Sequence, residues 1–224
     1  MTGLSPPTRI NGRVLIVGAS DASGSTGIQA AIKSISALGA FAAAAVTAVI
    51  IDEAATSHEV PPVAVAQQMR AVLADIGADV LLIGGLAGAG TIEAVADVLD
   101  GEARGIPLVL DLTDAATALL PLARIAGAAL VTSLSRGDVL ADGTTLSVFP
   151  PRRGTDRPVR GAAITLAAAV AAGLAQGLPL AAAVRRGRDY VEEAILTAPD
   201  FGRGPSPLNH VHTNRHTPAA SFES

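Results

Sequence analysis

Short apolar runs alternate along this chain with longer alanine-rich segments of helical periodicity, and few architectures accommodate that alternation. The runs are rich in Val, Ile and Leu, and most precede a segment long enough to form a helix. Uninterrupted apolar strands that are each followed by a helix are typical of a parallel sheet covered on both faces. The sequence therefore predicts an α/β fold with strands at 14–17, 42–50, 80–83, 108–110 and 129–132 and helices at 28–38, 61–76, 91–99 and 114–125.

The pattern changes after Ser133. Residues 139–148 contain Asp142-Gly143 between two short extended segments, which predicts a hairpin. Two alanine-rich helices are then expected at 162–176 and 180–196, with Gly177 between them. The predicted organisation is an N-terminal tail at 1–12, one α/β domain at 13–210 and a flexible polar tail at 211–224.

Composition excludes several classes of protein. Half of the 224 residues are hydrophobic and only 16% are charged, which excludes disorder for most of the chain. The absence of cysteine excludes a thiolate nucleophile, a zinc ribbon and disulfides. A net charge of −4 and an aromatic content of 2% argue against binding to nucleic acid. The apolar stretches at 35–51 and 161–184 are mostly Ala with Gly, so we expect a cytoplasmic protein that does not span a membrane.

Ligands of open parallel sheets lie beyond the carboxyl ends of the strands. This rule selects four segments that are expected to lie together at one edge of the sheet: Gly18–Gly27, Asp52–Glu53, Gly84–Gly85 and Asp111. The loop at 18–27 fits neither the Walker A nor the GxGxxG pattern, although its amides could face an anion. From the residues alone, a ligand loop and a plain turn capped by Ser25 or Thr26 remain equally open.

Other groups of polar residues have simpler interpretations than a catalytic or ligand-binding site. Asp114 could join Asp111 in holding Mg²⁺, but it more simply caps the following helix. Adjacent carboxylates on an extended segment face opposite ways, so Asp52 and Glu53 are expected to be loop charges, with acid–base work open to one of them. Three histidines of the C-terminal tail could bind a metal: His210, His212 and His216. We expect instead that the tail packs against the fold at His210. A cluster of arginines predicts a solvated helix face rather than an anion site: Arg185, Arg186 and Arg188.

Residues 18–50, GASDASGSTGIQAAIKSISALGAFAAAAVTAVI, resemble the opening of the hydroxymethylpyrimidine/phosphomethylpyrimidine kinases of thiamine synthesis, which belong to the ribokinase-like superfamily. The resemblance continues through LLIGGLA at 81–87, LVLD at 108–111, the predicted hairpin and DFGRGPSPLNH at 200–210. It implies a ribokinase-like fold and ATP-dependent phosphorylation of hydroxymethylpyrimidine and of its phosphate. It also implies roles for individual residues. Substrate-binding positions of the family fall on Ala19, Asp21, Thr26, Asp52 and Gly85, and a position for nucleotide and Mg²⁺ falls on Asp111.

The sequence departs from the family where the chemistry would occur. The family's GTGC motif forms an anion hole at a helix N-terminus, and its cysteine acts as the catalytic base; here the same register reads Gly161-Ala162-Ala163-Ile164. Isoleucine cannot accept a proton, so no catalytic residue of that motif is intact. About 30 residues, one helix–strand unit, are also missing after the strand at 129–132.

These departures lead to a prediction with stated alternatives. We expect a retained pyrimidine pocket with weak or absent phosphotransfer, and ATP with Mg²⁺ as cofactors only if the protein is active. The alternatives are a non-catalytic sensor of pyrimidines or thiamine precursors, a subunit that pairs with a true kinase, and a superfamily kinase for another small alcohol. Flat alanine-rich helices favour a homodimer or a higher oligomer.

Overall fold

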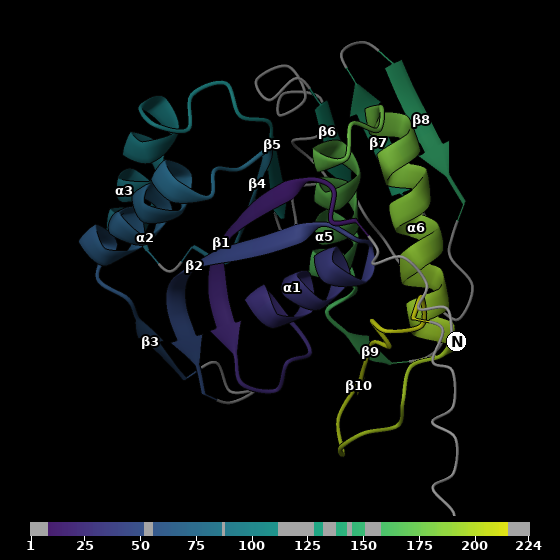
Figure 1. Ribbon diagram of the computed structural model, residues 1–224. Coiled ribbons are helices and arrows are strands. Elements are labelled where there is room, and N and C mark those ends of the chain that lie inside the picture. The colour runs from purple at the N-terminus through teal and green to yellow at the C-terminus, as the bar shows by residue number, and fades with distance from the viewer. Residues whose placement is uncertain are drawn as a thin grey trace, which may run out of the picture.

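Five strands form the central sheet of the protein, seen here in a computed structural model (Figure 1). The structure describes residues 9–51, 56–86, 88–111, 128–131, 138–142, 145–150 and 158–214. The strand order is β3-β2-β1-β4-β5, with β1 at Arg13–Asp21, β2 at Phe41–Ile50, β3 at Ser57–Glu59, β4 at Val80–Gly84 and β5 at Leu108–Asp111. All neighbouring pairs are parallel except β2 with β3. The predicted mostly parallel sheet is confirmed, and the short polar strand β3 is an addition that apolar patterning could not reveal.

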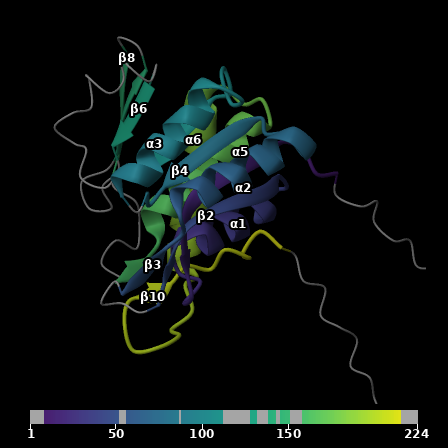
Figure 2. The same ribbon diagram turned by 90° about the vertical axis from the view of Figure 1, so that its left-hand side faces the viewer.

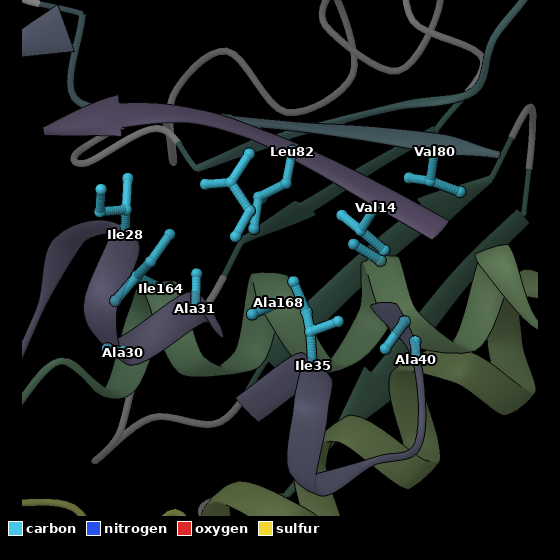
Figure 3. Close-up of a cluster of buried hydrophobic side chains, with 13 residues drawn as sticks. Val14, Ile28, Ala30, Ala31, Ile35, Ala40, Val80, Leu82, Ile164 and Ala168 are labelled. Atoms are coloured by element: carbon cyan, nitrogen blue, oxygen red, sulfur yellow. The ribbon is translucent and has the colours of Figure 1, made fainter. Parts of the chain in front are cut away.

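Helices cover both faces of this sheet (Figures 1 and 2). On one face, α1 (Gly27–Ala37) and α5 (Ala162–Ala175) pack against alternate residues of β1 and β4, among them Val14, Ile16 and Leu82. Figure 3 shows side chains of α1 and α5 directed toward these strand residues. On the other face, α2 (Pro62–Asp75) and α3 (Ala89–Asp100) pack against Leu15, Val17, Leu81 and Ile83. Burial on both faces explains why β1 is apolar at every position from Val14 to Val17 and β4 from Val80 to Ile83.

Two alanine-rich helices form a hairpin beside the sheet. Helix α6 (Leu180–Leu196) follows α5 after a turn at Gly177, whose φ is +81°. The two helices pack closely: a Cβ at Gly173 would lie 2.8 Å from the Cβ of Ala183. The predicted helices at 162–176 and 180–196 are confirmed, and small residues at the crossing set how near α5 and α6 approach.

A second sheet is antiparallel and contains β6 (Ala128–Val131), β7 (Asp138–Asp142) and β8 (Thr145–Phe149). The pairing of β7 with β8 confirms the predicted hairpin. The expectation that the strand at 129–132 joins the parallel sheet is wrong, because β6 pairs antiparallel with β7. Only residues 132–137 separate these two strands, and a parallel crossover takes about a dozen residues or more.

Arginines of α6 tie the second sheet to the helices. Arg188 is 8% exposed, forms an ion pair with Asp138 of β7 and lies 4.9 Å above the ring of Phe149. Arg186 donates to Gln176 at the end of α5, whereas Arg185 is exposed. The prediction of a solvated arginine face is therefore wrong for Arg186 and Arg188, because α6 has α5 on one side and β7 with β8 on the other.

The chain closes with a short parallel pair, β9 (Val159–Arg160) with β10 (Ser206–Pro207). None of the helices in the described part of the chain is long and apolar enough to cross a membrane. The predicted helix at 114–125 and the tail beyond Asn214 lie outside the described residues. The division into an N-terminal tail, a domain at 13–210 and a flexible tail stays a prediction.

Candidate functional site

Asp21, the last residue of β1, organises the turn that leads into α1. Its carboxylate accepts hydrogen bonds from the amide and the hydroxyl of Ser23, at 2.9 and 2.8 Å, and from the amide of Thr26, at 3.0 Å. Lys33 of α1 donates to the carbonyl of Gly24 at 2.7 Å. Because β1 continues to Asp21, the turn is shorter than the predicted 18–27. No side chain caps α1 at Thr26, so the turn is held by Asp21 rather than by a hydroxyl cap.

The pKa of Asp21 lies below its usual value of 3.8. Burial alone would raise this pKa, but hydrogen bonds from Ser23 and Thr26, with the charge of Arg160 nearby, outweigh burial. A carboxyl group with a lowered folded-state pKa stabilises the fold above its unfolded-state pKa, and that stabilisation is lost as the pH falls through the folded-state pKa.

An Asp21→Asn variant tests this role of the carboxylate. We expect it to lose about 2 kcal/mol of stability at neutral pH, because it removes charge-assisted hydrogen bonds. Below about pH 4 the wild-type chain should lose stability more steeply than the variant. Urea unfolding across this pH range measures both effects, and parallel pH profiles for the two proteins would contradict the assignment.

The first turn of α5 packs directly on the Asp21 turn. Gly161, which precedes α5, has φ +82°, and a Cβ at this position would lie 2.0 Å from the carbonyl oxygen of Ser25. The amides at the start of a helix have no intrahelical acceptor. Here Thr165 makes the first of the helical bonds, to the carbonyl of Gly161. The amides of residues 162–164 are therefore free to face an anion beside the Asp21 turn.

The contact between Gly161 and Ser25 predicts the effect of a single methyl group. Gly161→Ala should lower the free energy of unfolding by about 2 kcal/mol or more, since both the left-handed backbone and the overlap with Ser25 oppose a side chain. Gly177→Ala is the matched control, with φ +81° and no atom within 4 Å of the added Cβ. Chemical denaturation of both variants separates the effect of backbone strain from that of the clash with Ser25. Equal losses in the free energy of unfolding would show that the contact between Gly161 and Ser25 contributes nothing.

Asp111 and Ile164 meet at the carboxyl ends of β4 and β5. A Cβ at Gly84 would lie 3.3 Å from the Cβ of Asp111 and 3.5 Å from Cδ1 of Ile164. Ile164 is 8% exposed and points toward the sheet near Leu82 (Figure 3). Asp111 is half-buried, and burial raises the pKa of its carboxyl group. The structure thus places an apolar side chain, with no proton-accepting atom, beside this carboxylate.

A carboxylate oxygen of the Asp111 type suits Mg²⁺, which is commonly bound by one or two carboxylates together with substrate phosphates. Within the described part of the chain, no group of three or more His, Asp or Glu residues could hold a metal ion. Among the described residues, Asp111 is the carboxylate at this edge of the sheet that could bind a Mg²⁺ ion together with a phosphate ligand. Asp114, the other candidate, lies outside the described residues.

Ala19 and Gly85 lie side by side at the ends of β1 and β4. Gly85 has φ +73°, and a Cβ there would lie 3.6 Å from the Cβ of Ala19. The buried hydroxyl of Thr47 donates to the carbonyl of Gly85 at 2.7 Å. Gln68 of α2 bonds to both the amide and the carbonyl of Val46, next to the irregular step in the pairing of β1 with β2.

The structure brings together most of the residues selected from the sequence. Ala19 lies by Gly85, Thr26 by Asp21, and Asp111 by Ile164 at the end of the motif 161–164. Asp52 and Glu53 lie outside the described residues. Thr47 and Gln68 were not anticipated. Thr47 is the one polar residue in β2, which was the available signal, whereas no local signal distinguishes Gln68.

His210 is 3% exposed and bonds to Thr165. His212 stacks on Tyr190, with ring centroids 4.7 Å apart. The expectation that the tail packs against the fold at His210 is confirmed, and the contact of His212 was not anticipated. His216 lies outside the described residues.

The chain is similar to known proteins over most of its length. The family described as phosphomethylpyrimidine kinase matches residues 21–124 and 124–209. A hydroxymethylpyrimidine/phosphomethylpyrimidine kinase of Rhizobium meliloti is 32% identical over 88% of this chain and 96% of its own length. A thiamine biosynthesis bifunctional protein of Geobacter sulfurreducens is 31% identical over 89% of this chain, which spans about half (52%) of that protein. Both alignments, at 256 positions, are longer than the chain, so the relatives contain segments without a counterpart here.

Solved structures show the same fold. An ADP complex of Bacillus subtilis pyridoxal kinase superposes with a TM-score of 0.78 over 89% of this chain and 97% of that chain, at 20% identity. The ribokinase-like fold expected from the sequence is therefore confirmed. This likeness concerns the fold alone.

Proposed function

Because the chain belongs to the phosphomethylpyrimidine kinase family, we propose that it binds a hydroxymethylpyrimidine at the carboxyl edge of its sheet and phosphorylates it weakly or not at all. The observation that carries the proposal is the position of Ile164. This side chain is buried at the first turn of α5, beside Asp111 and Gly84, where the resemblance places the catalytic cysteine.

Phosphotransfer requires a path for one proton. The alcohol oxygen of the substrate forms a bond to the γ-phosphorus of ATP while the bond to the leaving ADP breaks, and the alcohol proton passes to a base. Ile164 offers no such base. Loss of a general base lowers a rate by about 10²–10⁴, and an impaired anion hole by about 10²–10³ more.

At the phosphate end of the proposed site, Ala163 stands where the family's GTGC motif has its second glycine, but the backbone amides remain. The amides of residues 162–164 face the transferred phosphoryl group, and the Asp21 turn packs on Gly161 and fixes where these amides lie. Asp111 would hold Mg²⁺, which neutralises phosphate charge when bound. Asp21 already accepts three hydrogen bonds within its turn, so its role in this proposal is to shape the turn rather than to contact the ligand.

The ring end of the proposed site lies beside Ala19 and Gly85. Thr47 fixes the carbonyl of Gly85, and neither Ala19 nor Gly85 carries a side chain larger than a methyl group. A site lined by such small residues can admit rings other than the pyrimidine. Pyridoxal, which is bound in the structure of a Staphylococcus aureus pyridoxal kinase, is therefore a suitable comparison ligand.

A thermal-shift titration with hydroxymethylpyrimidine, pyridoxal and Mg-ATP, followed by a turnover assay, tests the proposal. A ligand at a hundred times its dissociation constant stabilises by about 2.7 kcal/mol. For a domain of this size, that is a shift of roughly 5–10 °C. A shift with the pyrimidine together with slow or absent turnover supports the proposal. Turnover at ordinary kinase rates, or no shift with the pyrimidine, refutes it. A shift with the pyrimidine but none with Mg-ATP would favour the sensor or partner-subunit alternative.

A further inference from the structure

The C-terminal segment 206–213 holds the start of α5 from two sides. Ser206 and Pro207 pair in parallel with Val159 and Arg160, the residues directly before Gly161. Farther along the segment, Nε2 of His210 lies 3.0 Å from the hydroxyl of Thr165. The turn that carries the amides of residues 162–164 therefore lies between two points of attachment to the same segment.

His210 is itself firmly held. Its carbonyl accepts a hydrogen bond of 2.8 Å from the hydroxyl of Tyr190, a buried residue of α6. The ring of His212 stacks on Tyr190, and Thr213 donates to the carbonyl of Ala37 at the end of α1. The segment thus contacts α1, α5 and α6. The bond between His210 and Thr165 therefore holds the first turn of α5 in a fixed position relative to α1 and α6.

The environment of His210 keeps its ring neutral. Burial, with the charges of Lys33 and His212, lowers the pKa of His210 to about 4. The ammonium group of Lys33 also bonds to the carbonyl of Gly24 in the Asp21 turn. Lys33, the single lysine of the chain, therefore lies close to both the Asp21 turn and His210, the two structures that contact the first turn of α5.

We infer that His210 is a positioning residue: through Thr165 it fixes the first turn of α5, so that the amides of residues 162–164 bind the phosphate groups of a nucleotide ligand. The identity of the ligand in this inference rests on the proposed function. The positioning of the first turn of α5 by His210 does not depend on that function. His210 itself does not contact the ligand.

The test compares two ligands in the full-length chain, using Mg-ATP, which carries the γ-phosphate, as the phosphate-bearing probe and hydroxymethylpyrimidine as the ring probe. We expect His210→Ala to weaken the affinity for Mg-ATP about tenfold, which corresponds to about one lost hydrogen bond. The affinity for the pyrimidine should change by less than about twofold. A general loss of packing would weaken both ligands alike, and that result would overturn the inference.

Three further variants sharpen the test. Thr165→Val should reproduce the loss, and the double variant Thr165→Val/His210→Ala should lose no more than either single variant, as expected for two partners of one bond. His210→Gln, which keeps a polar atom, should restore part of the affinity. His212→Ala is the matched control, because His212 belongs to the same segment and contacts Tyr190 but not α5. A loss as large in His212→Ala as in His210→Ala would contradict the inference.

Amide hydrogen exchange separates this inference from the proposed function. His210→Ala should speed exchange across residues 159–166 with no ligand present, because Thr165 makes the first helical bond there. If the wild-type chain binds neither probe, the proposed function fails and faster exchange alone still supports the positioning role. Unchanged exchange overturns the positioning role whatever the chain binds.

Discussion

The double variant Ala163→Gly/Ile164→Cys is expected to phosphorylate hydroxymethylpyrimidine at least about 10²-fold faster than the wild-type chain. The change supplies a proton acceptor beside Asp111 and removes the exposed methyl group of Ala163 from the turn that faces the phosphate. The N-terminus of a helix lowers the pKa of a cysteine and favours the thiolate, whereas burial beside Asp111 opposes it, so the rate should rise with pH as the thiol ionises. Steady-state rates with Mg-ATP, measured beside pyrimidine affinity, give the result.

Ile164→Ala is the matched control for this gain. It removes the same apolar side chain from beside Gly84 and Asp111 without adding a base, so it should leave the rate unchanged and lower stability by about 2–5 kcal/mol. If the double variant is folded and binds the pyrimidine but gains no activity, the absent base is not what limits the reaction. The limit would then lie with the segments that the relatives have and this chain lacks.

Asp138→Asn is expected to lower the free energy of unfolding by about 3–5 kcal/mol, because it removes the buried carboxylate that pairs directly with the guanidinium of Arg188. For a chain of this size, each kcal/mol corresponds to roughly 2–4 °C in melting temperature. Chemical and thermal unfolding measure the loss directly.

The control for this ion pair removes both charges. Asp138→Leu/Arg188→Met replaces the pair with apolar side chains, and replacing a buried pair in this way is often neutral or stabilising. The double variant should therefore be more stable than Asp138→Asn. If Asp138→Asn lowers the free energy of unfolding by less than about 1 kcal/mol, the ion pair is no stronger than an ordinary surface ion pair. That result would show that water reaches Arg188.

The main sheet was predictable because both of its faces are buried. At β1 and β4, every position from Val14 to Val17 and from Val80 to Ile83 is apolar, which only a doubly covered strand requires. The second sheet was not predictable in the same way. Apolar residues at 129–132 fit a strand in either sheet, and the choice depends on the short connection to β7 rather than on the residues of the strand.

The candidate site was predictable in its location but not in its internal contacts. The ends of strands and the family resemblance both selected Ala19, Gly85, Asp111 and the motif at 161–164. The contact between Gly161 and Ser25 joins residues far apart in sequence through backbone atoms, so no residue type signals it. For the arginines of α6, the residue type itself gave a misleading signal. Their charge suggested solvent, and only the packing of α5, β7 and β8 around α6 reveals that Arg186 bonds to Gln176 and that Arg188 pairs with Asp138.

The position of α5 under the sheet has a consequence for how the chain is made. The sheet itself is built from residues 13–111, yet one face of β1 and β4 is covered in part by α5, which begins at Ala162. At a synthesis rate of about 5–20 residues per second, the part of this face that α5 covers stays exposed for some seconds after β5 has left the ribosome, with only α1 packed beside it. The N-terminal half, released alone as a fragment of residues 1–111, would present that apolar face to other chains and should aggregate unless a chaperone or α5 itself covers it.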